Sequence, residues 1–212
     1  MEDLKALVLF FKIPERKKVK SRLAKNLGEE MALTIYEDLL LKTVKTCEKF
    51  SKTSNVRLFA FYAGEKIEKI KEFFDFSLKW RFINQEGEGL GERLKRAGDF
   101  LFSIGFKVIV IIGADCPFID EAYLDEAFAM LEEYPLVIGP SRDGGYVLIG
   151  FNDNMKKRLS IIFDNLPFET SKLFEETLKR ISKDKIHLLP TLFDIDTPED
   201  YRKFTQIYKK LT

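Results

Sequence analysis

The sequence feature that most constrains the fold is the segment Val108–Pro117. Its first five residues are apolar and β-branched, and Gly-Ala-Asp-Cys-Pro follows them. Such a run is typical of a strand that is buried on both faces, as in the middle of a parallel sheet. Open α/β sheets bind their ligands beyond the carboxyl ends of the strands. Asp115, at the end of this run, is therefore a candidate functional carboxylate.

Similar apolar runs recur along the chain, and helical patterns separate most of them. The further strands are predicted at 6–11, 56–61, 81–85, 136–140, 146–151 and 186–189. The helices are predicted at 29–50, 66–74, 90–104, 120–133, 169–181 and 198–210. This alternation predicts an α/β fold, a mostly parallel sheet between two layers of helices. The short segment 141–145 between two apolar runs suits a hairpin or a tight functional loop, so we expect an antiparallel addition to the sheet.

The composition restricts the classes of function. A chain of 212 residues with 45% hydrophobic residues and a formal net charge of +1 suits one domain over residues 1–212. It lacks the basic excess of a nucleic-acid binder and any apolar run of membrane-spanning length, so neither partner is expected. Cys47 and Cys116 are too few for a disulfide framework or a four-cysteine zinc site. The scarcity of cysteine and an N-terminus unlike a signal peptide favour a cytoplasmic location.

A basic segment follows the first predicted strand. It places six Lys and Arg side chains within residues 12–22. Lys12, Lys20 and Arg22, with the hydroxyl of Ser21, are candidates for holding the phosphates of a nucleotide. The alternative is a basic loop that faces solvent.

A glycine-rich turn at 85–93 precedes the predicted helix 90–104. Gly91 and Arg93 are candidates for contacting an anion at the start of this helix. The turn does not fit the dinucleotide-binding fingerprint, because Glu92 stands at the last glycine position, and it lacks the Gly-Lys-Ser/Thr of a P-loop. An ordinary helix-start turn is the alternative.

Carboxylates follow several of the predicted strands. Asp115 could hold Mg²⁺, which prefers hard oxygen ligands, or it could cap the following helix. Asp143, before two glycines and a tyrosine, could act as a base or could merely shape a turn. In the segment 193–200, Thr197 resembles an N-cap and Pro198 a first helical residue, which leaves Asp194 and Asp196 without a role.

Taken together, these segments resemble a family of bacterial and archaeal proteins with the glycosyltransferase-like GT-A fold, described as of unknown function or as nucleotide-diphospho-sugar transferase-like. The matching residues are Lys12, Pro14, Val19–Leu23, Leu90–Arg93, Gly113–Pro117, Gly139–Pro140, Asp143–Tyr146, Leu148–Gly150 and Asp194–Asp200. They follow one another in order over nearly the whole chain. Lys17 is a departure, because the family usually has glycine there, so a phosphate loop that needs this glycine would have to be shaped differently.

The resemblance implies a transferase that uses a nucleotide-activated donor and Mg²⁺ or Mn²⁺. It places the basic segment near the donor phosphates and Asp115 near the metal. In the mechanism that fits this resemblance, Asp196 shares the metal, Asp115 and Asp143 act in catalysis, and Gly144, Gly145 and Tyr146 contact the acceptor. We expect glycosyl transfer from a nucleotide sugar to a small-molecule acceptor. The alternative is nucleotidyl transfer from a nucleoside triphosphate to a small phosphorylated acceptor, as in the distantly related 2-phospholactate and molybdenum-cofactor guanylyltransferases. A nucleotide-binding module without catalysis is the remaining possibility.

Overall fold

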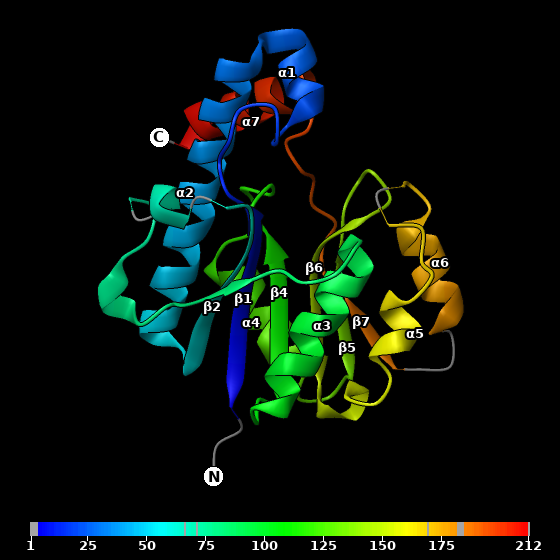
Figure 1. The fold of residues 1–212 in the computed structure, drawn as a ribbon. Coiled ribbons are helices and arrows are strands. Elements are labelled where there is room, and N and C mark those ends of the chain that lie inside the picture. The colour runs from blue at the N-terminus through cyan, green and yellow to red at the C-terminus, as the bar shows by residue number, and fades with distance from the viewer. Residues whose placement is uncertain (1–3, 66, 71, 169, 182–184, 212) are drawn as a thin grey trace.

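The computed structural model describes residues 4–65, 67–70, 72–168, 170–181 and 185–211. Within them, one seven-stranded sheet forms the centre, in the order β3-β2-β1-β4-β6-β5-β7 (Figure 1). The strands are β1 (Lys5–Lys12), β2 (Val56–Ala63), β3 (Arg81–Asn84), β4 (Val108–Gly113), β5 (Leu136–Pro140), β6 (Tyr146–Asn152) and β7 (Ile186–Leu188). Strand β6 runs antiparallel to β4 and β5, and the other pairs are parallel. The predicted mixed sheet and its hairpin at 141–145 are thus confirmed.

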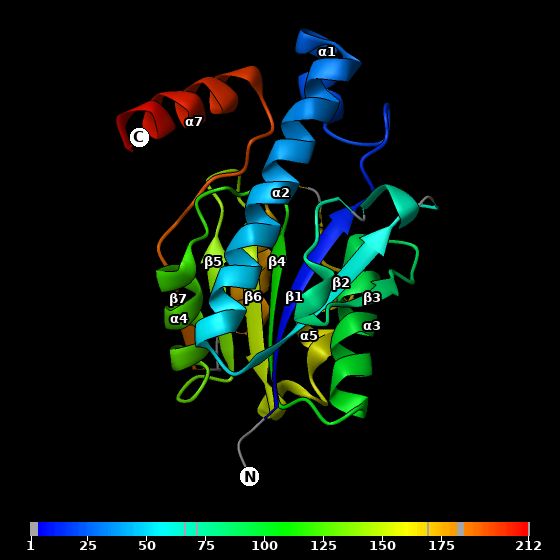
Figure 2. The ribbon, with the colours of Figure 1, turned by 90° about the vertical axis from the view of Figure 1, so that its left-hand side faces the viewer.

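Helices cover both faces of the sheet (Figures 1 and 2). The helices are α1 (Ser21–Leu27), α2 (Glu29–Thr53), α3 (Leu90–Ser103), α4 (Glu121–Met130), α5 (Leu159–Phe163), α6 (Leu173–Arg180) and α7 (Pro198–Leu211). Helices α2 and α4 pack on one face, and α3, α5 and α6 pack on the other. The result is the three-layer architecture that the sequence pattern predicts.

Strand β1 shows why the sheet holds two cores. Its side chains alternate, so that Leu7 and Leu9 join the core under α2 and α4, whereas Val8 and Phe10 join the core under α3. Strand β4, next to β1, is buried on both faces in the same way. The β-branched run Val108–Ile112 therefore occupies the centre of the sheet, as predicted.

Two predicted helices are shorter in the structure. The segment 66–74 forms only a 3₁₀ turn at Ile67–Ile70, and residues 66 and 71 lie outside the described part. The aromatic ring of Phe74 packs edge-on against the rings of Trp80 and Phe82, and this cluster replaces a continuing helix. The segment 169–181 is helical from Leu173, and residue 169 is not described.

Helices α1 and α7 lie together beyond the carboxyl end of β1 (Figures 1 and 2). A small separate core of Leu23, Ile35 and Ile195 joins α1, α2 and the segment before α7. Thr197 and Asp200 form reciprocal hydrogen bonds at the start of α7, which confirms the predicted helix start at Pro198. Among the described residues, no helix is long and apolar enough to span a membrane.

Candidate functional site

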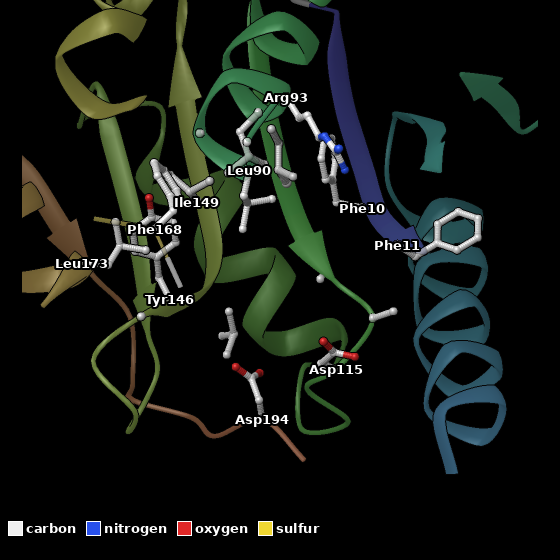
Figure 3. Close-up of a pocket in the computed structure, with 18 of the residues that line it drawn as sticks. Phe10, Phe11, Leu90, Arg93, Asp115, Tyr146, Ile149, Phe168, Leu173 and Asp194 are labelled. Carbon is white, nitrogen blue, oxygen red and sulfur yellow. The ribbon is translucent and has the colours of Figure 1, made fainter. Parts of the chain in front are cut away.

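A cavity of about 1320 Å³ opens at the carboxyl edge of β1 and β4 (Figure 3). Eleven of the twelve predicted site residues line it, although they come from distant parts of the chain. They are Lys12, Lys20, Ser21, Arg22, Gly91, Arg93, Asp115, Asp143, Gly145, Tyr146 and Asp196. The fold therefore brings nearly the whole predicted set to one place.

The side chain of Lys20 joins two of the predicted carboxylates. Its Nζ lies 2.8 Å from Oδ1 of Asp196 and 3.1 Å from Oδ1 of Asp115, and only 3% of the side chain is exposed. Burial by itself lowers the pKa of Lys20, but the attraction of both carboxylates outweighs it, so the pKa is raised and the ammonium stays charged. Lys20 is thus a buried cation in the lining of the cavity.

The backbone fixes the two carboxylates close together. The Ile195 N–H donates a 3.0 Å hydrogen bond to the carbonyl of Asp115, which ties the chain before α7 to the end of β4. Asp196 follows directly and also faces Arg22, with 3.5 Å between Oδ2 and the guanidinium. The Arg22 side chain is 67% exposed, so this second pair is weaker than the buried one.

Asp194 is a site residue that the sequence argument did not assign. It lines the same cavity, and its carboxylate lies 3.4 Å from the hydroxyl of Ser141. Burial raises the pKa of Asp194 to about 7, and the negative charge of Asp115 adds to this effect. The signal was present in the sequence, because Asp194 and Asp196 are two apart and share a face of an extended chain.

The structure decides between the alternatives for two carboxylates. Asp120, and not Asp115, caps α4, since its side chain accepts a hydrogen bond from the Tyr123 N–H. Asp143 does shape its turn, because its Oδ1 accepts a 3.0 Å hydrogen bond from the Gly145 N–H, and it also lines the cavity. The capping alternative is therefore wrong for Asp115, and the turn alternative holds for Asp143.

The basic segment is not simply a loop. It ends in α1, which begins at Ser21, and Lys20 precedes it in the left-handed conformation with φ of 47°. Lys17 is also left-handed, with φ of 65°. Lys17 thus adopts, at the position where the family usually has glycine, a conformation that glycine reaches without steric cost.

The glycine-rich turn is held by its own arginine. Nε of Arg93 donates a hydrogen bond to the carbonyl of Gly87 at 2.9 Å, and the side chain borders the cavity. A Cβ on Gly91 would lie 2.5 Å from the ring of Phe168, so this glycine is needed for helix packing. Its predicted contact with phosphate stays a prediction.

Gly144 is the predicted site residue that is not among the residues lining the cavity. A Cβ there would lie 2.0 Å from the carbonyl oxygen of Ser171, and the Gly144 carbonyl accepts a hydrogen bond from the Phe174 N–H. The close approach that we assigned to an acceptor is made instead by the protein's own backbone. Gly144 thus fixes the hairpin against the start of α6.

Two further residues at the cavity, Tyr36 and Gln85, were not assigned a role from the sequence. The Tyr36 hydroxyl, on α2, donates to the carbonyl of Lys12 and accepts from its N–H, so it fixes the end of β1. The Gln85 side-chain amide donates to the carbonyls of Phe11 and Phe61. Tyr36 belongs to no recognisable motif, and Gln85 only opens the glycine-rich turn, so the fold alone reveals these contacts.

The cavity has a polar end and an apolar wall. Asp115 and Asp194 lie at one end in Figure 3, whereas Ile149, Phe168 and Leu173 gather at one side with Tyr146. Burial strongly raises the pKa of the Tyr146 hydroxyl, which keeps its proton at neutral pH. A ligand with a charged group and a flat or apolar part matches this division.

The comparison with known families now adds to this geometry. Residues 46–170 match the family described as "Uncharacterized protein conserved in bacteria (DUF2064)", which is more than half of the chain. The chain belongs to the DUF2064 family. Its nucleotide-diphospho-sugar transferase-like resemblance, inferred from the motifs, is thereby confirmed.

The DUF2064 chain is also similar to curated enzymes. It is 30% identical over 185 residues to 2-phospho-L-lactate guanylyltransferase of Methanocaldococcus infernus, covering 85% of this chain and 77% of that protein. The enzyme of the same name from Methanocaldococcus jannaschii is 31% identical over 134 residues, covering 63% of this chain and 57% of that protein. These relatives are transferases, and so is this DUF2064 chain.

Solved structures share its fold. A crystal structure from Desulfovibrio desulfuricans, named only provisionally as a nucleotide-diphospho-sugar transferase, is 26% identical with a TM-score of 0.87, over 98% of this chain and 89% of that one. CMP:2-keto-3-deoxy-manno-octonic acid synthetase, complexed with CTP, is 9% identical with a TM-score of 0.64, over 99% of this chain and 100% of that one. At that identity the second likeness concerns the fold alone.

Proposed function

We propose that this protein is a divalent-metal-dependent nucleotidyltransferase. It joins the nucleotide of a nucleoside triphosphate to a small phosphorylated acceptor and releases pyrophosphate. The observation that carries the proposal is the buried Lys20 ammonium between Asp115 and Asp196 in a large open cavity. The curated relatives, all named as guanylyltransferases, favour this reaction over the glycosyl transfer that we first expected from sequence.

The cationic side chains bind the triphosphate in this proposal. Lys20 and Arg22 face the cavity from the start of α1, and Lys12 borders it from the end of β1. Arg22 presents a planar guanidinium, which can hold two phosphate oxygens at once. These charges stabilise the negative charge that develops on the leaving pyrophosphate.

Two carboxylates are candidate ligands for a divalent cation, and among the described residues no group of three or more His, Cys, Asp or Glu side chains gathers as a metal site. Oδ1 of Asp115 is buried, and its contact with Lys20 is an ion pair that is not aligned as a hydrogen bond. The carboxylate of Asp196 contacts the same Lys20 ammonium and provides a second possible ligand. Asp115 and Asp196 would hold Mg²⁺ or Mn²⁺, since these ions prefer hard oxygen ligands. When bound, the metal neutralises phosphate charge and makes the α-phosphorus easier to attack.

The chemical step is a substitution at phosphorus. An oxygen of the acceptor phosphate attacks the α-phosphorus, the bond from this phosphorus to the bridging oxygen breaks, and pyrophosphate leaves. Asp143, which lines the cavity, orients the acceptor, and the apolar wall with Phe168 takes an organic part of one substrate. An attacking phosphate is already anionic, so the step requires no strong base.

The test is incubation of the purified protein with ATP, CTP, GTP or UTP, Mg²⁺ and 2-phospho-L-lactate or another small phosphorylated acid. We expect one triphosphate to yield pyrophosphate and a product whose mass equals the acceptor plus a nucleoside monophosphate. Asp115→Asn should abolish the reaction with the fold intact by circular dichroism. Release of nucleoside diphosphate from a nucleotide sugar, with no pyrophosphate from any triphosphate, would restore the glycosyltransferase hypothesis.

A further inference from the structure

The place between Asp115 and Asp196 already holds a positive charge. Nζ of Lys20 is 3.1 Å from Oδ1 of Asp115 and 2.8 Å from Oδ1 of Asp196. With 3% of its side chain exposed, Lys20 has little access to solvent. Its ammonium therefore depends on these two carboxylates for partners as long as no ligand is bound.

A divalent cation held by the same two oxygens would meet this ammonium. Like charges repel strongly in a partly buried site, where water screens them poorly. Oδ1 of Asp115 is buried and already pairs with Lys20, so it has little room for a second cation. A divalent cation and the Lys20 ammonium would therefore bind the same two carboxylates, those of Asp115 and Asp196.

We infer that Lys20 and a divalent cation compete for Asp115 and Asp196, so that Lys20 keeps the cation weakly bound until the phosphates of the nucleotide give its ammonium a new partner. Lys20 thereby couples the binding of metal to the binding of nucleotide. The inference rests on the proposed function only for the identity of the two ligands. It concerns equilibrium binding and requires no turnover.

Arg22 differs from Lys20 in the exposure of its side chain and in the strength of its ion pair. It contacts the other oxygen of Asp196, at 3.5 Å, and 67% of its side chain is exposed. A cation that displaces Arg22 leaves it in water at little cost, whereas displaced Lys20 loses a buried ion pair. We therefore assign the exclusion of the metal to Lys20.

The test measures Mn²⁺ binding without nucleotide by electron paramagnetic resonance. Wild type should bind Mn²⁺ weakly, and Lys20→Met should bind it more tightly by about tenfold or more, since a buried positive charge has been removed. Lys20→Arg keeps the charge and should remain weak. Lys25→Met, an exposed lysine on the adjoining helix α1, is the control and should equal wild type.

Thermal unfolding provides a second readout and checks the fold. Lys20→Met and Lys20→Gln leave two carboxylates without their partner, so both should melt below wild type and regain stability when Mn²⁺ is added. Wild type should gain little. The inference is overturned if wild type and Lys20→Met bind Mn²⁺ equally, if Lys20→Arg binds it as tightly as Lys20→Met, or if the folded Met and Gln variants bind none. Absence of transferase activity with every triphosphate would instead reject the proposed function and leave these affinities unchanged.

Discussion

The N–H of Ile195 donates a 3.0 Å hydrogen bond to the carbonyl of Asp115, and this one contact joins two halves of the candidate site. Asp115 lies two residues after the central strand β4, and Ile195 lies in the segment that leads to α7. The bond brings Asp196 to the same ammonium that Asp115 contacts. The C-terminal segment is therefore part of the site, although it is far from β4 in sequence.

Asp196 should be required for metal-dependent binding of the donor. We expect Asp196→Asn to weaken the affinity for a nucleoside triphosphate in Mg²⁺ and to change it little when EDTA replaces the metal. Isothermal titration calorimetry under both conditions measures the difference. Asp200→Asn, in the same segment but at the cap of α7, is the control and should keep the affinity. Equal affinities of Asp196→Asn and wild type in Mg²⁺ would remove Asp196 from the metal site.

Arg22 should contribute to donor affinity through its charge. Arg22→Ala should weaken triphosphate binding by about tenfold to a hundredfold, the range for lost hydrogen bonds to a charged group. The affinity of wild type should also fall as salt is added, because part of the side chain is exposed. Lys25→Ala, on the same helix but outside the cavity lining, should bind as wild type does. If Arg22→Ala binds the triphosphate as tightly as wild type, Arg22 only faces solvent and does not contact the donor.

The charge and the turn-forming role of Asp143 can be separated by substitution. Asp143→Asn keeps an oxygen that can accept the Gly145 N–H, whereas Asp143→Ala loses it. If the charge acts on the acceptor, both variants should spare donor binding and lower kcat. If Asp143 only shapes the turn, Asp143→Asn should retain the activity of wild type and Asp143→Ala alone should lose it.

Gly144 and Gly145 should differ in their tolerance of a side chain. Gly144→Ala should lower the free energy of unfolding by about 1–2 kcal/mol or more, since φ is +89° and the Cβ would collide with the Ser171 carbonyl. Gly145→Ala meets only the Asp143 carboxylate at 3.3 Å and should cost less. Urea denaturation of the two variants measures the difference. Equal losses would show that the Ser171 contact is unimportant for the hairpin.

The sheet could be predicted from sequence because its central strands carry long apolar runs that only a buried strand accommodates. Helix α1 could not, since its seven residues are mostly polar or basic and it follows a left-handed lysine. Helix α5 was missed because a five-residue apolar segment has no helical period to detect. Phe74, at the end of another predicted helix, packs instead against the rings of Trp80 and Phe82, and no helical period reveals such contacts.

The candidate site could be predicted in outline for a related reason. Polar residues at successive strand ends meet at one edge of a parallel sheet, so Asp115, Lys20 and Asp196 were expected near one another. The ion pairs of Lys20 with Asp115 and Asp196 could not be predicted, because they depend on where the segment before α7 passes the end of β4. Tyr36 and Gln85 act through backbone carbonyls, which leave no pattern in the sequence.

The central claim is that the reaction transfers a nucleotide rather than a sugar. It is tested most directly with a nucleoside triphosphate labelled in its α-phosphate, Mg²⁺ and a small phosphorylated acid. The account predicts that the label enters the acceptor product while one unlabelled pyrophosphate is released for each product formed. Label that remains in free nucleotide, together with sugar transfer from a nucleotide sugar in the same preparation, would contradict it.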